Sequence, residues 1–129
     1  MLIQQPRDTA SKLHKDTFKI LVDLFPFSKI QHEYPIKMNG HTLFIDIFME
    51  KPFRLAVECH GEQHFSYVGH FHSSRADLLR QQRFDVMKAQ WCEENGIPLV
   101  VVKHSDKLSH EFLLNLIDQA IKKEGRGHG

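Results

Sequence analysis

The sequence predicts a mixed α/β domain in which three helices surround a small sheet. Apolar residues recur at helical spacing in three segments, at about residues 9–25, 73–94 and 108–123. Short apolar or alternating runs, at residues 30–36, 43–48, 53–60 and 97–102, are typical of strands. The expected order is helix, three-strand antiparallel meander, helix, strand, helix, in which the long second helix returns the last strand to the sheet.

The first helix is expected to begin at Thr9 or Ser11, both of which are good N-caps. It should end at about Phe25, because Pro26 cannot continue a helix. Its apolar face repeats every three or four residues, with one polar threonine filling a gap in the stripe. The members of that face are Leu13, Thr17, Ile20, Leu21 and Leu24, flanked by Phe18, Val22 and Phe25.

The meander is marked by its turns. Asn39-Gly40 is a strong hairpin sequence between the first two strands, and residues 50–52 form the expected turn before the third strand. A loop rich in histidine and aromatic residues follows at 61–72. The second helix should run from about Ser73, a good N-cap, to Glu94, where Asn95-Gly96 ends it.

The second helix places Phe84, Met87 and Trp91 on its core face. The run at 97–102 is continuously apolar, as expected of a strand that is buried on both faces. The last helix should bury a stripe of five residues. These are Phe112, Leu113, Leu116, Ile117 and Ile121.

Length and composition indicate one domain of 129 residues, with an ordered core at about 9–123 and flexible tails. The formal net charge is +1, so there is no strong global field to attract nucleic acid, and any DNA contact must come from a local patch. Cys59 and Cys92 form no CxxC pattern and are expected to be reduced thiols in a cytoplasmic protein. We find no signal peptide and no apolar segment that approaches a membrane span.

Two apolar strands each carry one carboxylate, Asp46 and Glu58. If the turn lies near residues 51–52, Asp46 is roughly opposite Glu58, with Cβ atoms about 4.5–5.5 Å apart. Two like charges that close repel each other and raise each other's pKa, unless a cation lies between them. Oxygen ligands favour Mg²⁺ or Mn²⁺ over Zn²⁺. The alternative is a pair of partly exposed acids neutralised by Arg54 or Lys51.

The third strand leads into a run of polar residues in which His60 and His64 flank Gly61 and Gln63. A histidine near a metal site can serve as a general base, because its ordinary pKa is close to neutral. Gln63 could orient a water or a phosphate. His70 and His72 belong to a second, aromatic-rich cluster, which suits contacts to nucleic acid. An alternative is a zinc site built from several of these histidines, although their spacing matches no standard finger.

On the second helix, Asp85 and Lys88 are three residues apart and share a face. One reading is a solvated ion pair. In the other, this face packs over the sheet, where Asp85 holds a site histidine in its useful tautomer and Lys88 lies nearby. The helix also carries four basic residues that are candidates for DNA contact. They are Arg75, Arg80, Arg83 and Lys88.

The order of elements, the acid in the second strand and Glu-x-His in the third resemble the restriction-endonuclease-like PD-(D/E)XK nucleases. In that pattern His60 stands where lysine is usual. The closer resemblance is to the very-short-patch-repair-like branch, which includes phage and homing endonucleases with a Glu, Asp, x, His, Asp site. The matching segments are SKLHK at 11–15, Glu33, FIDIF around Asp46, VECHGEQHFSYVGHFH at 57–72 and DVMKAQWCEENGI at 85–97.

The resemblance implies a Mg²⁺- or Mn²⁺-dependent DNA endonuclease, encoded by a phage or mobile element and acting in the host cytoplasm. It makes Asp46 the metal ligand, His64 the catalytic histidine and Asp85 the last acid, with Glu58 and Gln63 in support. Repair enzymes of this branch carry the leading Glu on the first helix, where this sequence has His14; either Glu33 or His14 would take its role. The chain lacks the zinc-binding cysteines of mismatch-repair members, so mismatch repair is not implied.

DNA is the expected partner, cut by a monomer, by a homodimer or with a separate specificity partner. Two other readings stay open. One is a non-catalytic nucleic-acid-binding or partner-regulating module on the same fold. The other is a histidine-rich zinc domain, which would lose its fold when the metal is removed.

Overall fold

A computed structural model describes residues 11–61 and 75–127 of the chain. Its elements follow the predicted order. They are α1 (Lys12–Leu24), β1 (Lys29–Met38), β2 (His41–Lys51), β3 (Leu55–His60), α2 (Arg75–Glu94), β4 (Leu99–Lys103) and α3 (His110–Gly127). The prediction of a mixed α/β domain with three helices and a meander is therefore confirmed.

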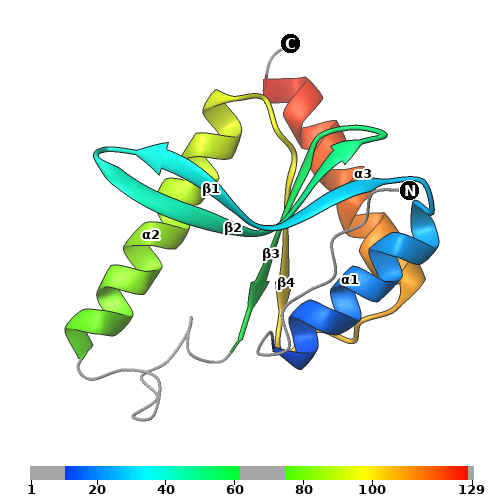
Figure 1. Ribbon diagram of the computed structural model, residues 1–129, viewed down its shortest axis with the longest axis horizontal. Helices are drawn as coiled ribbons and strands as arrows, with labels where there is room; N and C mark the ends of the chain where they lie inside the picture. The colour runs from blue at the N-terminus through cyan, green and yellow to red at the C-terminus, as the bar shows by residue number, and fades with distance from the viewer. Residues whose placement is uncertain (1–10, 62–74, 128–129) are drawn as a thin grey trace.

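The four strands form one mixed sheet in the order β1-β2-β3-β4. The first three strands are antiparallel, whereas β4 runs parallel to β3. Figure 1 shows the reason: α2 covers one face of the sheet and carries the chain back to the start of β4, while α1 and α3 lie together on the opposite side. Both faces of the central strands are thus covered by helices.

The ends of the elements follow local rules, with small shifts from the predicted bounds. Ser11 caps α1, because its hydroxyl accepts a hydrogen bond from the backbone N–H of His14. Ser109 caps α3 in the same way through Phe112, so this helix begins later than predicted. It also continues to Gly127, beyond the frayed tail expected from residue 124. Gly96 has φ of 65°, and α2 ends there as predicted.

The hairpin between β1 and β2 turns at Asn39-Gly40, with φ angles of 50° and 79°. Two positive φ angles are what a tight hairpin turn requires, so the prediction from this dipeptide is confirmed. Strand β2 is longer than expected and reaches Lys51; the turn therefore falls at residues 52–54, and β3 begins at Leu55 rather than Phe53.

The side chains of the long β1–β2 hairpin exchange faces of the sheet about halfway along its length. Ile30 and His32 face α1, whereas Tyr34 and Ile36 lie in the cluster on the α2 side, although all four are even-numbered residues of one strand. The residue between the two halves, Glu33, has φ of 52°. This left-handed residue reverses the facing of the strand, and the hairpin tip consequently crosses over α2 (Figure 1).

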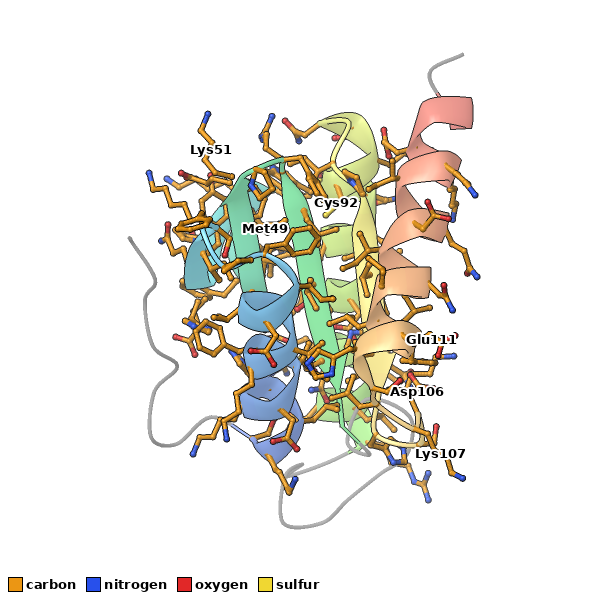
Figure 2. All side chains as sticks on the ribbon, turned by 90° about the vertical axis from the view of Figure 1, so that its right-hand side faces the viewer. Met49, Lys51, Cys92, Asp106, Lys107 and Glu111 are labelled. Atoms are coloured by element: carbon orange, nitrogen blue, oxygen red, sulfur yellow. The ribbon has the colours of Figure 1, made fainter. Side chains whose placement is uncertain are left out.

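Two apolar clusters hold the layers together. The cluster between the sheet and α1 and α3 is built on Ile47, Met49, Leu55, Val57, Val100 and Val102. The cluster on the α2 side contains Phe48, Ala56, Met87, Cys92 and Ile97, and Phe84 and Trp91 pack against it as predicted. In the side view of Figure 2, Met49 and Cys92 lie inside the molecule, whereas Lys51 and Lys107 lie at its periphery. Both cysteines are buried free thiols.

Some predicted core positions are corrected by the packing. Ile121 of α3 is 41% exposed, whereas Leu113 and Ile117 of the same stripe are buried. In β4, Val100 and Val102 are buried while Leu99 and Val101 are only partly covered, so the strand is less enclosed than its apolar run suggested. Among the described residues, no helix is both long and apolar enough to cross a membrane.

The packing of α3 provides a matched test of the core. Leu113 is 0% exposed and its neighbour Leu114 is 47% exposed. We expect Leu113→Ala to lower the free energy of unfolding by about 2–5 kcal/mol, because it leaves a cavity in the cluster beneath α3. Leu114→Ala should change it by no more than about 0.5 kcal/mol. Urea unfolding of both variants measures the difference, and equal effects would contradict the packing of this helix.

Candidate active site

Asp46 and Glu58 meet where β2 and β3 stop pairing as a ladder. The last ladder pair is Ile47 with Val57, so the same register places Asp46 opposite Glu58, as predicted. Beyond this pair, hydrogen bonds to the two carboxylates take the place of backbone-to-backbone bonds. The backbone N–H of Asp46 donates to Glu58 Oε2 over 3.0 Å, and the N–H of Cys59 donates to Asp46 Oδ2 over 2.8 Å. We call these reciprocal bonds the carboxylate clasp.

The turn-over of the hairpin makes the clasp possible. The β1–β2 register steps from His32 and Ile47 to Tyr34 and Ile45 and passes over Glu33 and Asp46. The Asp46 N–H is instead directed to Glu58 on the other neighbouring strand. A local break in the regular backbone therefore brings two carboxylates from adjacent strands into one network.

Glu58 is the most deeply buried acid of the site, with 2% of its surface exposed. Burial raises its pKa to about 8, and the negative charge of Asp46 adds to this, while Lys88 acts in the opposite direction. The alternative in which exposed acids pair with Arg54 or Lys51 is therefore wrong for Glu58: the acid is buried, and its ion pair is with Lys88.

Helix α2 supplies the other charged groups. Lys88 Nζ lies 3.0 Å from Glu58 Oε1, and its side chain is 15% exposed. Burial acts to lower the pKa of Lys88, but the carboxylates of Glu58, Asp46 and Asp85 outweigh it, and the net pKa is raised. Asp85, one turn earlier, has Oδ1 3.8 Å from His60 Nε2. The reading of Asp85 and Lys88 as a solvated pair is thus wrong, and this face packs over the sheet. The prediction that Lys88 contacts DNA is wrong as well, because its side chain is mostly buried and its ammonium pairs with Glu58.

The alternation of side chains along β3 explains this meeting. Ala56, Glu58 and His60 share the face toward α2, whereas Val57 and Cys59 face α1 and α3. One ligand atom each from Glu58, His60 and Asp85 lies within 4.8 Å of the others, a spacing that suits a metal ion. Among the residues that the structure describes, this is the one such group of three, and it contains a single histidine.

The residues fit a divalent cation at the carboxylate clasp. Two carboxylates share one network there, and the raised pKa of Glu58 reports the cost of their negative charges in a buried place. A cation next to both oxygens would relieve that cost. Carboxylate oxygens are the donors that Mg²⁺ and Mn²⁺ prefer.

The two candidates for the leading Glu lie in different surroundings. Glu33 is an exposed residue of β1. His14 of α1 is buried, and burial lowers its pKa while the charge of Asp46 opposes the change. Its Nε2 lies 2.8 Å from Nδ1 of His32, which is also buried. His14 is therefore within electrostatic reach of Asp46, and Glu33 lies opposite the same residue in the β1–β2 register.

Other predicted site residues are not brought together in this way. Arg75, Arg80 and Arg83 are exposed on α2, and Arg80 lies 3.2 Å from Asp77. Gln63, His64, His70 and His72 lie outside the described residues, so their roles and the histidine-rich zinc alternative stay predictions.

Two contacts were not predicted from the sequence: the pairing of Lys88 with Glu58 and that of His14 with His32. The spacing along the helix gave an indication of the Lys88 contact. Lys88 follows Met87 and lies four residues after Phe84, which places it at the border of the core face. The second had a weaker indication, since His32 alternates with polar residues in β1 but nothing in its spacing points to α1.

The chain is similar to proteins of several animal viruses. It is 30% identical over 96 residues to uncharacterized protein 307L of Invertebrate iridescent virus 6, covering 70% of this chain and 48% of that protein. It is 36% identical over 87 residues to uncharacterized protein 033L of Invertebrate iridescent virus 3, covering 65% and 43%. It is 35% identical over 93 residues to uncharacterized protein 094L of Frog virus 3, covering 70% and 59%.

The chain thus spans about half the length of the curated relatives it matches. No family model matches it, and no solved structure does. These comparisons show that the chain is similar to viral proteins.

The pKa of Glu58 predicts a pH dependence of stability. A carboxyl whose pKa is higher in the folded state than the ordinary 4.5 keeps its proton on folding, so stability falls as pH rises from 4.5 to about 8. Between pH 6.5 and 8, the free energy of unfolding should fall by about 1–2 kcal/mol from this group.

Glu58→Gln removes the titrating group and should abolish that part of the slope. Urea unfolding in EDTA at pH 6.5 and pH 8 measures it, and Glu111→Gln, on an exposed position of α3, is the control that should retain the wild-type slope. Parallel pH profiles of wild type and Glu58→Gln would contradict the raised pKa.

Proposed function

We propose that the chain is a Mg²⁺- or Mn²⁺-dependent DNA endonuclease that hydrolyses phosphodiester bonds. The observation that supports this most directly is the carboxylate clasp, which holds Asp46 and Glu58 together at the end of the β2–β3 ladder. A stable core would not need two acids there, because burial and mutual repulsion both disfavour their charged forms. A cation-dependent reaction on a phosphate does need them.

The topology supports the finer assignment to a restriction-endonuclease-like core. Three antiparallel strands are followed by a parallel fourth, which is reached through α2, and a helix precedes the meander. The acids lie on the second and third strands, as the sequence resemblance implies. Since a fold alone hosts many activities, the proposal depends on the site rather than on this likeness.

In this proposal Asp46 and Glu58 would hold the cation, together with the backbone carbonyl of Cys59. A bound divalent ion supplies positive charge to the scissile phosphate and makes a nearby water more acidic. The chain's own residues must keep the carboxylates in place. The N–H groups of Asp46 and Cys59 do so, because each fixes one carboxylate oxygen.

Proton transfer is assigned to a histidine on the same face. His60 lies beside the clasp, and Asp85 Oδ1 at 3.8 Å from its Nε2 would stabilise the imidazolium that forms when His60 accepts a proton. The distance exceeds that of a hydrogen bond, so the pair would have to tighten when substrate is bound. His64, the catalytic histidine that the resemblance implies, remains the other candidate for this role.

DNA is the proposed substrate, and α2 is the proposed face for its backbone. Arg75, Arg80 and Arg83 are exposed along this helix and could contact phosphates. Similarity to proteins of iridescent viruses and of a frog virus supports a viral origin. Action as a homodimer, or with a specificity partner, stays a prediction.

One observation favours a second candidate, a non-catalytic nucleic-acid-binding module. The clasp bonds and the Lys88 ammonium already give both acids partners within the protein. Such a network could serve only to hold β2, β3 and α2 together. The two candidates differ in whether the acids bind a cation and whether DNA is cut.

The test is incubation of supercoiled plasmid with the protein in Mg²⁺, Mn²⁺ or EDTA, beside Asp46→Asn. The asparagine can still accept the hydrogen bond from Cys59, so the fold should persist. Because charge stabilisation by a bound metal contributes several kcal/mol, we expect the substitution to reduce cleavage by at least about 10²-fold. Asp118→Asn, at an exposed acid that pairs with Lys122, should cut like wild type.

Nicking or linearisation that requires both metal and Asp46 would support the nuclease. Equal cleavage by wild type and Asp46→Asn would refute the assigned site. Retardation of DNA in a gel without cleavage in any metal would favour the binding module instead.

A further inference from the structure

A second candidate ion position lies on the other side of Glu58. Its Oε2 belongs to the carboxylate clasp, whereas its Oε1 faces α2. On that side Glu58, His60 and Asp85 place one ligand atom each within 4.8 Å of the others. This set, which we call the α2-side triad, has two oxygen donors and one nitrogen donor. It is compatible with Mn²⁺ or Zn²⁺ and less suited to Mg²⁺ because of the imidazole.

A positive charge already lies at this position. The Lys88 ammonium is 3.0 Å from Glu58 Oε1, and the charges of Asp85 and Asp46 also stabilise it. The Lys88 side chain is mostly buried, so the packing of α2 on the sheet fixes the position of the ammonium. A divalent ion bound to the triad would lie next to this ammonium and be repelled by it.

We propose that the Lys88 ammonium takes the place of a second metal ion, and that the α2-side triad is a divalent-cation site which Lys88 closes. This inference rests on the proposed function, since it assumes a first ion at the carboxylate clasp. It makes the protein a one-metal enzyme with a built-in cation.

The spacing of Asp85 and Lys88 explains how one helix can supply both a potential metal ligand and a competing positive charge. Asp85 and Lys88 are three residues apart and so point from the same face toward the sheet. Asp85 reaches His60 near the end of β3, and Lys88 reaches Glu58 two residues earlier in the strand. The helix thus delivers a potential ligand and the charge that competes with a metal for it.

The experiment is a titration with Mn²⁺ of the untagged protein, followed by calorimetry and by electron paramagnetic resonance. Wild type should bind about one Mn²⁺ per chain with the spectrum of an isolated ion. Lys88→Met keeps the length of the side chain but removes its charge, and it should bind about two. The two ions would be about 4 Å apart and would give a spin-coupled spectrum.

Three controls isolate the site. Lys88→Arg keeps the charge and should bind about one ion. Lys122→Met removes a lysine from an exposed pair with Asp118 and should leave the stoichiometry unchanged. Lys88→Met with Asp85→Asn lacks one triad ligand and should lose the second ion. If Lys88→Met does not fold by circular dichroism, Lys88→Gln replaces it, because its amide can still donate to Glu58.

The outcomes separate this inference from the nuclease proposal. A coupled pair of ions in wild type would overturn the role of Lys88 while leaving the nuclease intact. A single ion in both wild type and folded Lys88→Met would overturn the closed site. No ion in wild type but one in Lys88→Met would support the role of Lys88 and count against a metal at the clasp. No ion in either would overturn both proposals.

Discussion

The burial of the Glu58 carboxylate beside Asp46 is the constraint around which this domain is arranged. A buried acid must find partners, and here each partner comes from a different element. The backbone of β2 donates to it, the side chain of Asp46 bonds back to β3, and Lys88 reaches it from α2. The carboxylate clasp therefore joins two strands and a helix at the point where the ladder between β2 and β3 ends.

The rest of the fold places that point. Apolar clusters on both faces of the sheet fix α1 and α3 on one side and α2 on the other (Figure 1). The positive φ of Glu33 turns the hairpin over, and the clasp lies at the level of this reversal. On the α1 side of the same level, His14 meets His32. The local departure from regular strand geometry thus coincides with the gathering of titratable groups, as is common at functional sites.

Regular patterns in the sequence predicted most of the architecture. Periods of two and of three to four residues gave the order of the elements, and Asn39-Gly40 set the hairpin register. Two-residue alternation in β3, with the turn before it, was enough to place Asp46 opposite Glu58 even though the turn itself lies slightly further along the chain. These features depend on local chemistry, so a single sequence carries them.

What could not be predicted depends on how elements pack on one another. Lys88 pairs with Glu58 because α2 crosses the sheet at a particular rotation, which periodicity alone does not specify. His14 and His32 are eighteen residues apart and meet only when α1 docks on β1. The reversal at Glu33 uses a positive φ at a residue other than glycine, so the sequence carried no glycine that would indicate it. Ile121 kept the helical period but is 41% exposed, because how far a helix packs on the sheet is not set by its own periodicity.

The charges of the site suggest how the domain tolerates such an arrangement. Asp46, Glu58 and Asp85 bring three carboxylates together against the single ammonium of Lys88, which leaves an excess of two negative charges. One divalent ion would balance them. Without it, the raised pKa lets Glu58 keep a proton near neutral pH and so removes part of the excess.

Proton and metal ion would then be alternative occupants of the same carboxylate. Because the metal must displace that proton, its affinity should rise with pH until Glu58 is ionised near pH 8. The burial that makes Glu58 costly to ionise would thereby make the proposed site responsive to cation and pH together.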